Sequence, residues 1–209
     1  MDIQIRTAAM QELEQMARCQ TRAFNEREPM TMALGFTHEE YYRYLLKTLP
    51  LSIEDGLSFN AIDMAAGKIA GTLILFDAFI DESRLPELTK VEMQGVVNTN
   101  RIFEELEKPL LVNEFFKAGQ CVRMMFISVE DGFLRFGIAS KLLSYAEEMI
   151  RKKGYKIGIA DATNFRSACL LEKHEFKKIN EIIYSRIKTE GRNPFALVEG
   201  SCCLYIKYL

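Results

Sequence analysis

A strand, a loop and a helix follow one another between Cys121 and Gly154, and this unit constrains the fold more than any other part of the sequence. The apolar run from Val122 to Val129 is rich in β-branched and aromatic side chains, which predicts a buried strand. Apolar residues then recur at three- and four-residue intervals up to a basic last turn before Gly154, which predicts a helix. They are Ile138, Leu142, Ala146 and Met149.

The loop between this strand and helix has the composition of an anion-binding turn. Gly137 and Ala139 have little or no side chain, so a ligand can lie close to the backbone. The first amides of a helix have no intrahelical partner, and the helix dipole is positive there. These features predict a binding site for a phosphate or pyrophosphate, while a purely structural turn with a glycine gives the same pattern.

The same stretch resembles the signature of the GCN5-related N-acetyltransferase (GNAT) superfamily, in which a turn with two small residues joins a strand to a helix. The arginine or glutamine that leads this turn in the family falls on Leu134, and Arg135 stands one place later. The resemblance implies that strand and loop bind acetyl-coenzyme A (acetyl-CoA), with the pyrophosphate on the loop. The cofactor-binding residues that it implies here are Phe126, Ile127, Ser128, Val129, Leu134, Arg135, Phe136, Gly137, Ile138, Ala139 and Ser140.

Composition indicates an ordinary globular protein. With 209 residues, 48% of them hydrophobic and 27% charged, a single domain over residues 1–209 is the simplest expectation. A net charge of -2 gives no basic footprint for nucleic acid, and no apolar run is long enough for a membrane span. The N-terminus lacks the pattern of a secretory signal, and the five cysteines and two histidines have no metal-site spacing. We therefore expect a cytoplasmic monomer or homodimer without a metal.

Glu28 is the candidate general base. It lies between a predicted helix of about residues 8–23, which Thr7 can cap, and a second predicted helix over 37–49. Pro29 requires an extended or turn conformation at Glu28. A charged connection of this kind is also typical of a solvated loop. However, a Glu-Pro pair in this place resembles the arylalkylamine-type acetyltransferases of the superfamily, and that resemblance implies that Glu28 faces the acceptor amine.

The segment after the next strand resembles the second superfamily motif. Asn164 matches the asparagine that binds the pantetheine or phosphate arm of the coenzyme, and the tyrosine that often protonates the leaving thiolate falls on Leu171. In arylalkylamine-type members two hydroxyl residues take over this proton transfer, and their places map onto Thr163 and Ser167. Alternatively, Thr163 is only a helix cap and Ser167 only a small residue that permits close packing.

The other segments complete the order of elements that the superfamily requires. A short strand is predicted at 2–6, a hairpin at 57–80, a central strand at 155–162, and two final strands at 177–188 and 196–209. The resemblance implies an α/β GNAT fold, in which helices flank both faces of a mixed, twisted sheet of about seven strands. Its central parallel strands would separate to admit the pantetheine arm.

The charged segment 81–120 stands where the superfamily often has only a short turn. We interpret it as a helical insertion, in two pieces, that covers the acceptor side. Four apolar residues are candidate contacts to the acceptor, although for any one of them a role as an anchor to the core is the better explanation. They are Phe103, Leu106, Phe115 and Phe116.

The implied reaction is direct transfer of an acetyl group from acetyl-CoA to the primary amine of a small molecule that is similar to an arylalkylamine. An alkylammonium has a pKa of about 10, so it must lose a proton before it attacks the thioester. Two alternatives stay open. One is acetylation of a peptide N-terminus or a lysine, which needs an open groove, and the other is a non-catalytic module that binds coenzyme A.

Overall fold

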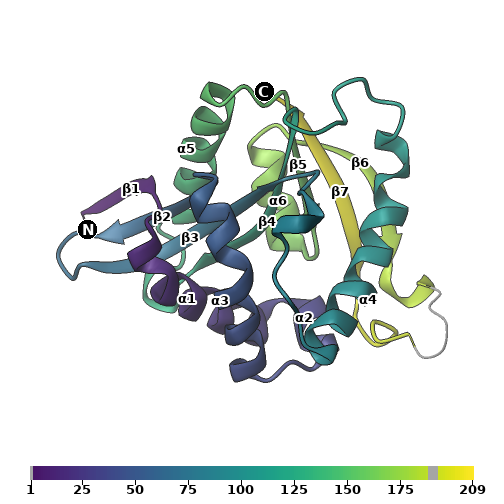
Figure 1. The fold of residues 1–209 in the computed structure, drawn as a ribbon, viewed down its shortest axis with the longest axis horizontal. Helices are drawn as coiled ribbons and strands as arrows, with labels where there is room; N and C mark the ends of the chain where they lie inside the picture. The colour runs from purple at the N-terminus through teal and green to yellow at the C-terminus, as the bar shows by residue number, and fades with distance from the viewer. Residues whose placement is uncertain (1, 188–192) are drawn as a thin grey trace.

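A seven-stranded mixed sheet runs through the computed structural model, which describes residues 2–187 and 193–209 (Figure 1). The strand order is β1-β2-β3-β4-β5-β7-β6; β4 and β5 are parallel, and all other neighbours are antiparallel. The strands are β1 Ile3–Thr7, β2 Ser58–Asp63, β3 Lys68–Asp77, β4 Cys121–Val129, β5 Ile157–Ala162, β6 Lys177–Ile183 and β7 Ser201–Tyr208. The predicted mixed sheet is confirmed.

Helices cover both faces of this sheet (Figure 1). Side chains alternate across a strand, so Leu73 packs with the core under α5 and α6, whereas Ile74 packs with the core under α1 and α3. On the same face as α1 and α3, the helices α2 and α4 cover β5 and β7. The helices are α1 Leu13–Arg27, α2 Pro29–Leu34, α3 His38–Glu54, α4 Lys90–Glu107, α5 Ile138–Lys152 and α6 Phe165–Lys173.

The parallel strands β4 and β5 pair over only part of their length. Their register begins at Cys121 with Ile157 and ends at Met124 with Ala160. On its other edge β4 carries a bulge, because Ile74 pairs with Phe126 and Leu75 with Met124, which leaves Met125 as an extra residue. The two strands therefore diverge at the middle of the sheet, as the resemblance to the superfamily implied.

The first helix is shifted along the chain from its predicted position. Thr7 is the last residue of β1 and caps nothing, and α1 extends to Arg27. Most of the predicted loop is therefore helical, and Glu28 alone separates α1 from α2. Its extended backbone (φ −99°, ψ 117°) agrees with the effect expected from Pro29.

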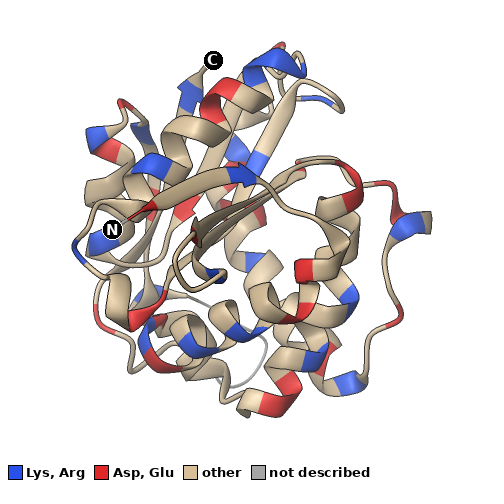
Figure 2. Cartoon of the chain, turned by 90° about the vertical axis from the view of Figure 1, so that its left-hand side faces the viewer, with Lys and Arg blue, Asp and Glu red and all other residues tan. Residues whose placement is uncertain are grey.

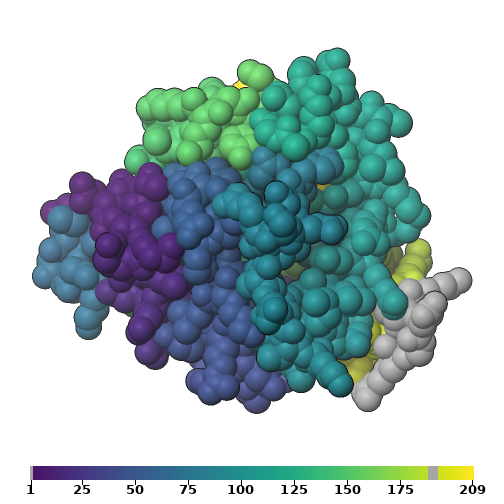
Figure 3. All heavy atoms as spheres, viewed as in Figure 1, coloured from purple at the N-terminus to yellow at the C-terminus, as the bar shows by residue number. Residues whose placement is uncertain are grey.

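The segment 81–120 contains one long helix, α4, instead of two pieces. In Figure 3 the teal atoms of this segment cover much of the front of the molecule, beside the blue atoms of α3. Leu106 is fully buried in the core under α4, and Phe115 and Phe116 pack against the same core, so these three are anchors. Phe103 remains as a candidate contact.

The strands at the C-terminus are shorter than predicted. The strand expected at 177–188 ends at Ile183, because a 3-10 turn starts at Tyr184 and buries that side chain completely. The last strand begins at Ser201. Residues 188–192, which include part of the predicted polar turn, lie outside the described residues.

Charges of both signs lie side by side on the face shown in Figure 2, so this face has no patch of one sign. Among the described residues, no helix is long and apolar enough to cross a membrane. The same part of the chain has no group of three His, Cys, Asp or Glu side chains that is arranged to hold a metal ion.

Candidate active site

A cavity of about 990 Å³ enters the sheet where β4 and β5 diverge. It brings together residues from every motif that the sequence singled out. Phe136 is the exception, since its side chain is exposed outside this cavity. The predicted site residues that line it are Glu28, Phe126, Ile127, Ser128, Val129, Leu134, Arg135, Gly137, Ile138, Ala139, Ser140, Thr163, Asn164 and Ser167.

One side of the cavity is formed by the β4–α5 loop and the start of α6. We call it the donor half, because the resemblance in the sequence implies that the acetyl donor binds there. Gly137 is the N-cap of α5 and has a left-handed backbone (φ 73°), so glycine is needed there for its conformation. No side chain caps α5, which leaves the amides of its first turn open. Arg135, Arg166 and Lys173 also line the cavity. Open amides and cations together suit an anion.

The hydroxyl of Ser140, in the first turn of α5, contacts a histidine side chain. Its Oγ lies 2.7 Å from His174 Nε2. His174 follows α6 as its C-cap residue, and its Nδ1 lies 3.4 Å from Glu147 Oε1. Glu147 Oε2 accepts from Lys207 Nζ at 2.6 Å. A chain of polar contacts therefore runs from the cavity wall to β7.

The β4 wall offers backbone rather than side-chain chemistry. Ser128 Oγ lies 3.2 Å from Cys19 Sγ in the contact between β4 and α1, so this hydroxyl belongs to the core. Burial raises the pKa of the Cys19 thiol to about 12, which keeps it protonated at neutral pH. The bulge at Met125 lies in this wall, beside the point where β4 leaves β5.

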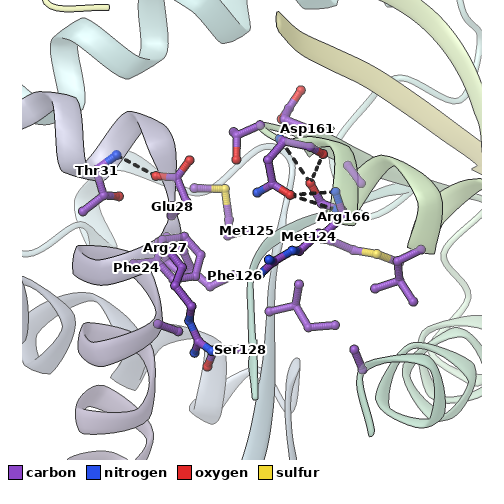
Figure 4. A pocket seen from close by; sticks show the side chains of 18 of the residues that line it. Phe24, Arg27, Glu28, Thr31, Met124, Met125, Phe126, Ser128, Asp161 and Arg166 are labelled. Atoms are coloured by element: carbon purple, nitrogen blue, oxygen red, sulfur yellow. Dashed lines mark hydrogen bonds between the residues drawn. The ribbon is translucent and has the colours of Figure 1, made fainter. Parts of the chain in front are cut away.

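The opposite side is centred on Glu28. We call it the acceptor half, because the resemblance implies that the amine that accepts the acetyl group lies there. Its carboxylate is buried and caps α2: Oε1 accepts from the Met30 amide at 3.0 Å and Oε2 from the Thr31 amide at 2.6 Å. These two donors stabilise the anion and fix its position. Each oxygen keeps lone pairs for a further donor. Figure 4 shows Glu28 on the α1–α2 side of the cavity, facing Met125.

Aromatic rings surround the acceptor half. Phe24 stacks on Tyr41 with centroids 6.1 Å apart and meets Phe126 edge to face at 5.3 Å. Tyr41 in turn stacks on Tyr44 at 5.9 Å. Burial raises the pKa of Tyr41 well above its usual value and that of Tyr44 to about 12, so both rings are neutral. Phe36 also lines the cavity.

Helix α4 forms the roof of the acceptor half. Gly95 packs directly on the ring of Phe36, since a Cβ atom at Gly95 would lie only 2.3 Å from that ring. Glu92 at the start of α4 is buried, caps the helix and pairs with Lys47 of α3 at 2.7 Å. The residues of α4 that line the cavity are Glu92, Gly95, Val96, Thr99, Asn100 and Phe103.

The segment that joins β5 to α6 lies at the floor of the cavity. Asn164 caps α6, because its Oδ1 accepts from the amides of Arg166 (3.0 Å) and Ser167 (3.1 Å), and only its amide nitrogen is left for a ligand. Ser167 Oγ donates to the Asn164 carbonyl at 2.9 Å. The Thr163 carbonyl accepts from the Tyr184 hydroxyl at 2.9 Å. Thr163 precedes the N-cap and is not the cap itself.

A buried ion cluster, which was not predicted from the sequence, lies beside the cavity. Arg123 on β4 bonds both Asp161, at the end of β5, and Glu107, at the end of α4. Asp161 lines the cavity (Figure 4), and burial raises the pKa of its carboxyl and of Glu107, while Arg123 opposes both shifts. An acidic residue inside the otherwise apolar strand Ile157–Ala162 was the signal available in the sequence.

Comparisons with known proteins identify the fold. Neither a protein-family model nor a curated protein sequence matches the chain. Solved structures do match over its whole length. The C-terminal condensation domain of Ebony, in complex with beta-alanyl-dopamine, has a TM-score of 0.84 at 17% identity and covers 100% of this chain and 99% of its own. The mosquito arylalkylamine N-acetyltransferase like 5b has a TM-score of 0.78 at 22% identity, with 100% of both chains covered.

Arylalkylamine N-acetyltransferase 2 from Aedes aegypti has a TM-score of 0.74 at 20% identity and covers 99% of both chains. The order of strands and the separation of β4 from β5 agree with this likeness. The chain has the GNAT fold, and the resemblance seen in the sequence is confirmed at that level.

Proposed function

We propose that this protein is an acyltransferase that moves an acetyl group from acetyl-CoA to the primary amine of a small molecule. The observation that carries the proposal is that one cavity has two chemically different halves. Its donor half has open helix amides and cations, its acceptor half has the buried Glu28 among aromatic rings, and the two halves meet where β4 and β5 diverge.

The donor half fits coenzyme A. The pyrophosphate would bind the amides of Ile138, Ala139 and Ser140, with Arg135 and Arg166 as counter-charges. The pantetheine arm would lie between β4 and β5, where the free amide of Asn164 is in reach of it. The thioester carbonyl would then accept from a backbone amide of Phe126–Val129, which would stabilise the oxyanion of the tetrahedral intermediate.

The chemistry follows from the positions of the titrating groups. The acceptor ammonium would lose one proton to Glu28, directly or through a water molecule. The free amine would attack the thioester carbon, forming a C–N bond, and collapse of the intermediate would break the C–S bond. The departing thiolate would take a proton from the Ser167 hydroxyl, which would turn away from the Asn164 carbonyl to deliver it. The second proton of the attacking nitrogen would pass through Thr163 and restore the Ser167 hydroxyl. The products would be the amide, the free thiol and one proton, which Glu28 would release to solvent.

The roof supports a small acceptor over a polypeptide. Helix α4 closes the acceptor half through the Gly95–Phe36 contact and the Glu92–Lys47 pair, whereas a peptide substrate needs an open groove. The aromatic rings around Glu28 favour an arylalkylamine, because they offer stacking surfaces and favour a cation. Structural neighbours that act on arylalkylamines, and the neighbour that holds beta-alanyl-dopamine, support the same substrate class.

The test is release of coenzyme A thiol from acetyl-CoA with a panel of arylalkylamines, polyamines and short peptides. We expect turnover with an arylalkylamine, and we expect Glu28→Gln to lower kcat/KM by about 100- to 10,000-fold, the range typical of a lost general base. The dissociation constant of coenzyme A should stay unchanged in this variant. Glu26→Gln is the matched control, since Glu26 is exposed two residues away.

The outcomes separate the alternatives. Turnover with peptides alone would replace the small-molecule acceptor with a polypeptide. Tight coenzyme A binding without turnover of any amine would indicate a non-catalytic module. Repeating the panel with β-alanyl-CoA tests which acyl group is transferred. Faster turnover with β-alanyl-CoA than with acetyl-CoA would contradict the proposal that acetyl is the transferred group. Failure to bind coenzyme A at all would refute the proposal.

A further inference from the structure

His174 is a buried titratable group that lies directly behind the wall of the donor half. Its ring contacts Ser140 Oγ through Nε2 at 2.7 Å, and only 10% of its side chain is exposed. Ser140 lies in the first turn of α5 and lines the cavity, so its hydroxyl stands between His174 and the proposed pyrophosphate site. Neither the acetyl transfer nor the helix cap explains why a histidine is needed at this contact.

The protonation state of His174 decides what the Ser140 hydroxyl can do. When the ring is neutral with its proton on Nδ1, facing Glu147, Nε2 is an acceptor and Ser140 must donate to it. Ser140 then presents only lone pairs to the cavity, which repel a phosphate oxygen. When the ring is protonated, Nε2–H donates to Ser140 Oγ, and the hydroxyl proton is free to bind the phosphate.

The charged groups around the ring allow both states. From α5, Glu147 Oε1 lies 3.4 Å from Nδ1 and favours the imidazolium. From β7, the positive charge of Lys207 disfavours the imidazolium, but the Nζ of Lys207 binds the other oxygen of Glu147 at 2.6 Å. In the sequence, His174 stands between Lys173 and Glu175, which have opposite charges, and the C-terminal end of the α6 dipole favours a cation at the C-cap. Charges of both signs therefore surround the ring, and neither its neutral nor its protonated form is excluded.

We propose that His174 is a positioning residue that couples binding of the coenzyme A pyrophosphate to uptake of one proton. Coenzyme binding would favour the imidazolium, which directs the Ser140 hydroxyl toward a phosphate oxygen and adds a positive charge behind it. The affinity for the coenzyme therefore falls as the pH rises, because the neutral ring no longer donates to Ser140 Oγ. This inference rests on the donor half of the proposed function and does not depend on the identity of the amine.

The test is isothermal titration with 3′-dephospho-coenzyme A between pH 5.5 and 8.0. This ligand lacks the phosphate monoester, whose own pKa of about 6 would interfere. A charge-assisted hydrogen bond changes binding by roughly 10- to 100-fold, so we expect the dissociation constant to rise by about 10-fold over this range. Buffers of different ionisation enthalpy should show uptake of up to one proton near neutral pH.

Two variants identify the group that takes up the proton. His174→Gln retains a hydrogen-bonding nitrogen but does not titrate, so the pH dependence and the proton uptake should disappear while the protein binds the ligand with one intermediate affinity. His38→Gln is the matched control, because His38 is the other histidine of the chain and is exposed at the start of α3. It should keep the pH dependence of the wild type.

Several results would overturn the inference. They are a dissociation constant that is independent of pH, tighter binding at high pH, or a pH dependence that survives in His174→Gln or is lost in His38→Gln. Nuclear magnetic resonance of the His174 ring checks the same point without a variant, since ligand binding at a fixed pH must increase the protonated fraction of the ring. Absence of binding at every pH would instead refute the proposed donor half.

Discussion

The two halves of the cavity are built in different ways. In the donor half, β4, the glycine turn and the first turn of α5 follow one another in the sequence, and the groups that face the cavity are mainly backbone amides. The acceptor half is assembled from the α1–α2 junction and α4, together with the ion cluster of Arg123, Asp161 and Glu107 beside the cavity. These segments are far apart in the chain, and their contacts depend on buried side chains. Backbone geometry is local, whereas a buried charge needs partners that only the complete fold supplies.

This difference predicts where each half is vulnerable. A change in the donor half should act through the conformation of a single loop and leave the acceptor half intact. A change in the acceptor half should affect the stability of the whole protein, because its charged side chains join distant strands and helices.

The largest effect is expected for Arg123→Met. The variant leaves Asp161 and Glu107 buried without their shared cation, so we expect the free energy of unfolding at pH 7 to fall by about 3–5 kcal/mol, as measured by urea denaturation. Arg84→Met is the control, because Arg84 makes a two-pronged pair with Asp55 at the surface, and its loss should have little effect. Equal losses of unfolding free energy in both variants would contradict the expectation that the buried ion cluster contributes more than a surface ion pair.

The pH dependence of this effect has a defined sign. Burial raises the pKa of Asp161 and Glu107 in the folded state. Carboxyls with raised pKa values contribute stability that is present below the pKa of the unfolded state and is lost as the pH rises through the folded-state pKa. Without Arg123 these pKa values rise further, so the deficit of Arg123→Met should shrink as the pH is lowered. A deficit that stays constant as the pH is lowered would show that the lost term is packing.

The next effect, in the donor half, is expected for Gly137→Val. A β-branched residue is strained at φ 73°, by about 1–3 kcal/mol, and relief of that strain would displace the first amides of α5. We expect coenzyme A affinity to fall by at least about 10-fold. Gly67→Val is the matched control: Gly67 has φ 63° in the β2–β3 turn, also with open space around it, so it should lose similar stability and keep its affinity.

The sequence could predict the donor half because local rules determine it. An apolar run, a glycine that must adopt positive φ and a 3.6-residue period fix β4, the turn and α5 without reference to the rest of the chain. Glu28 became a candidate through the resemblance to a family, while Pro29 predicted only its extended backbone. The same reasoning gave seven strands in the correct order along the chain.

What the sequence could not supply are contacts between distant segments. Nothing local indicates that Arg123 bonds both Asp161 and Glu107, because the three belong to β4, β5 and α4. Nor does periodicity show that His174 lies behind Ser140, since a histidine after a helix is typical of a cap. The single helix α4 was predicted as two pieces, although Thr89 and Glu92 form a capping box at its start, a local signal that the prediction did not use.

The smallest of these effects is expected for Gly95→Ala, which tests the roof of the acceptor half. Alanine favours the helix by about 1 kcal/mol, but its Cβ would lie 2.3 Å from the Phe36 ring, so the overpacking cost of about 1–3 kcal/mol should outweigh that gain and displace the ring. We expect KM for the amine to rise a few-fold with an unchanged dissociation constant for coenzyme A. Gly95→Ala combined with Phe36→Leu makes room for the methyl group and should restore the thermal midpoint. If coenzyme A binding weakened instead, the two halves would not be independent.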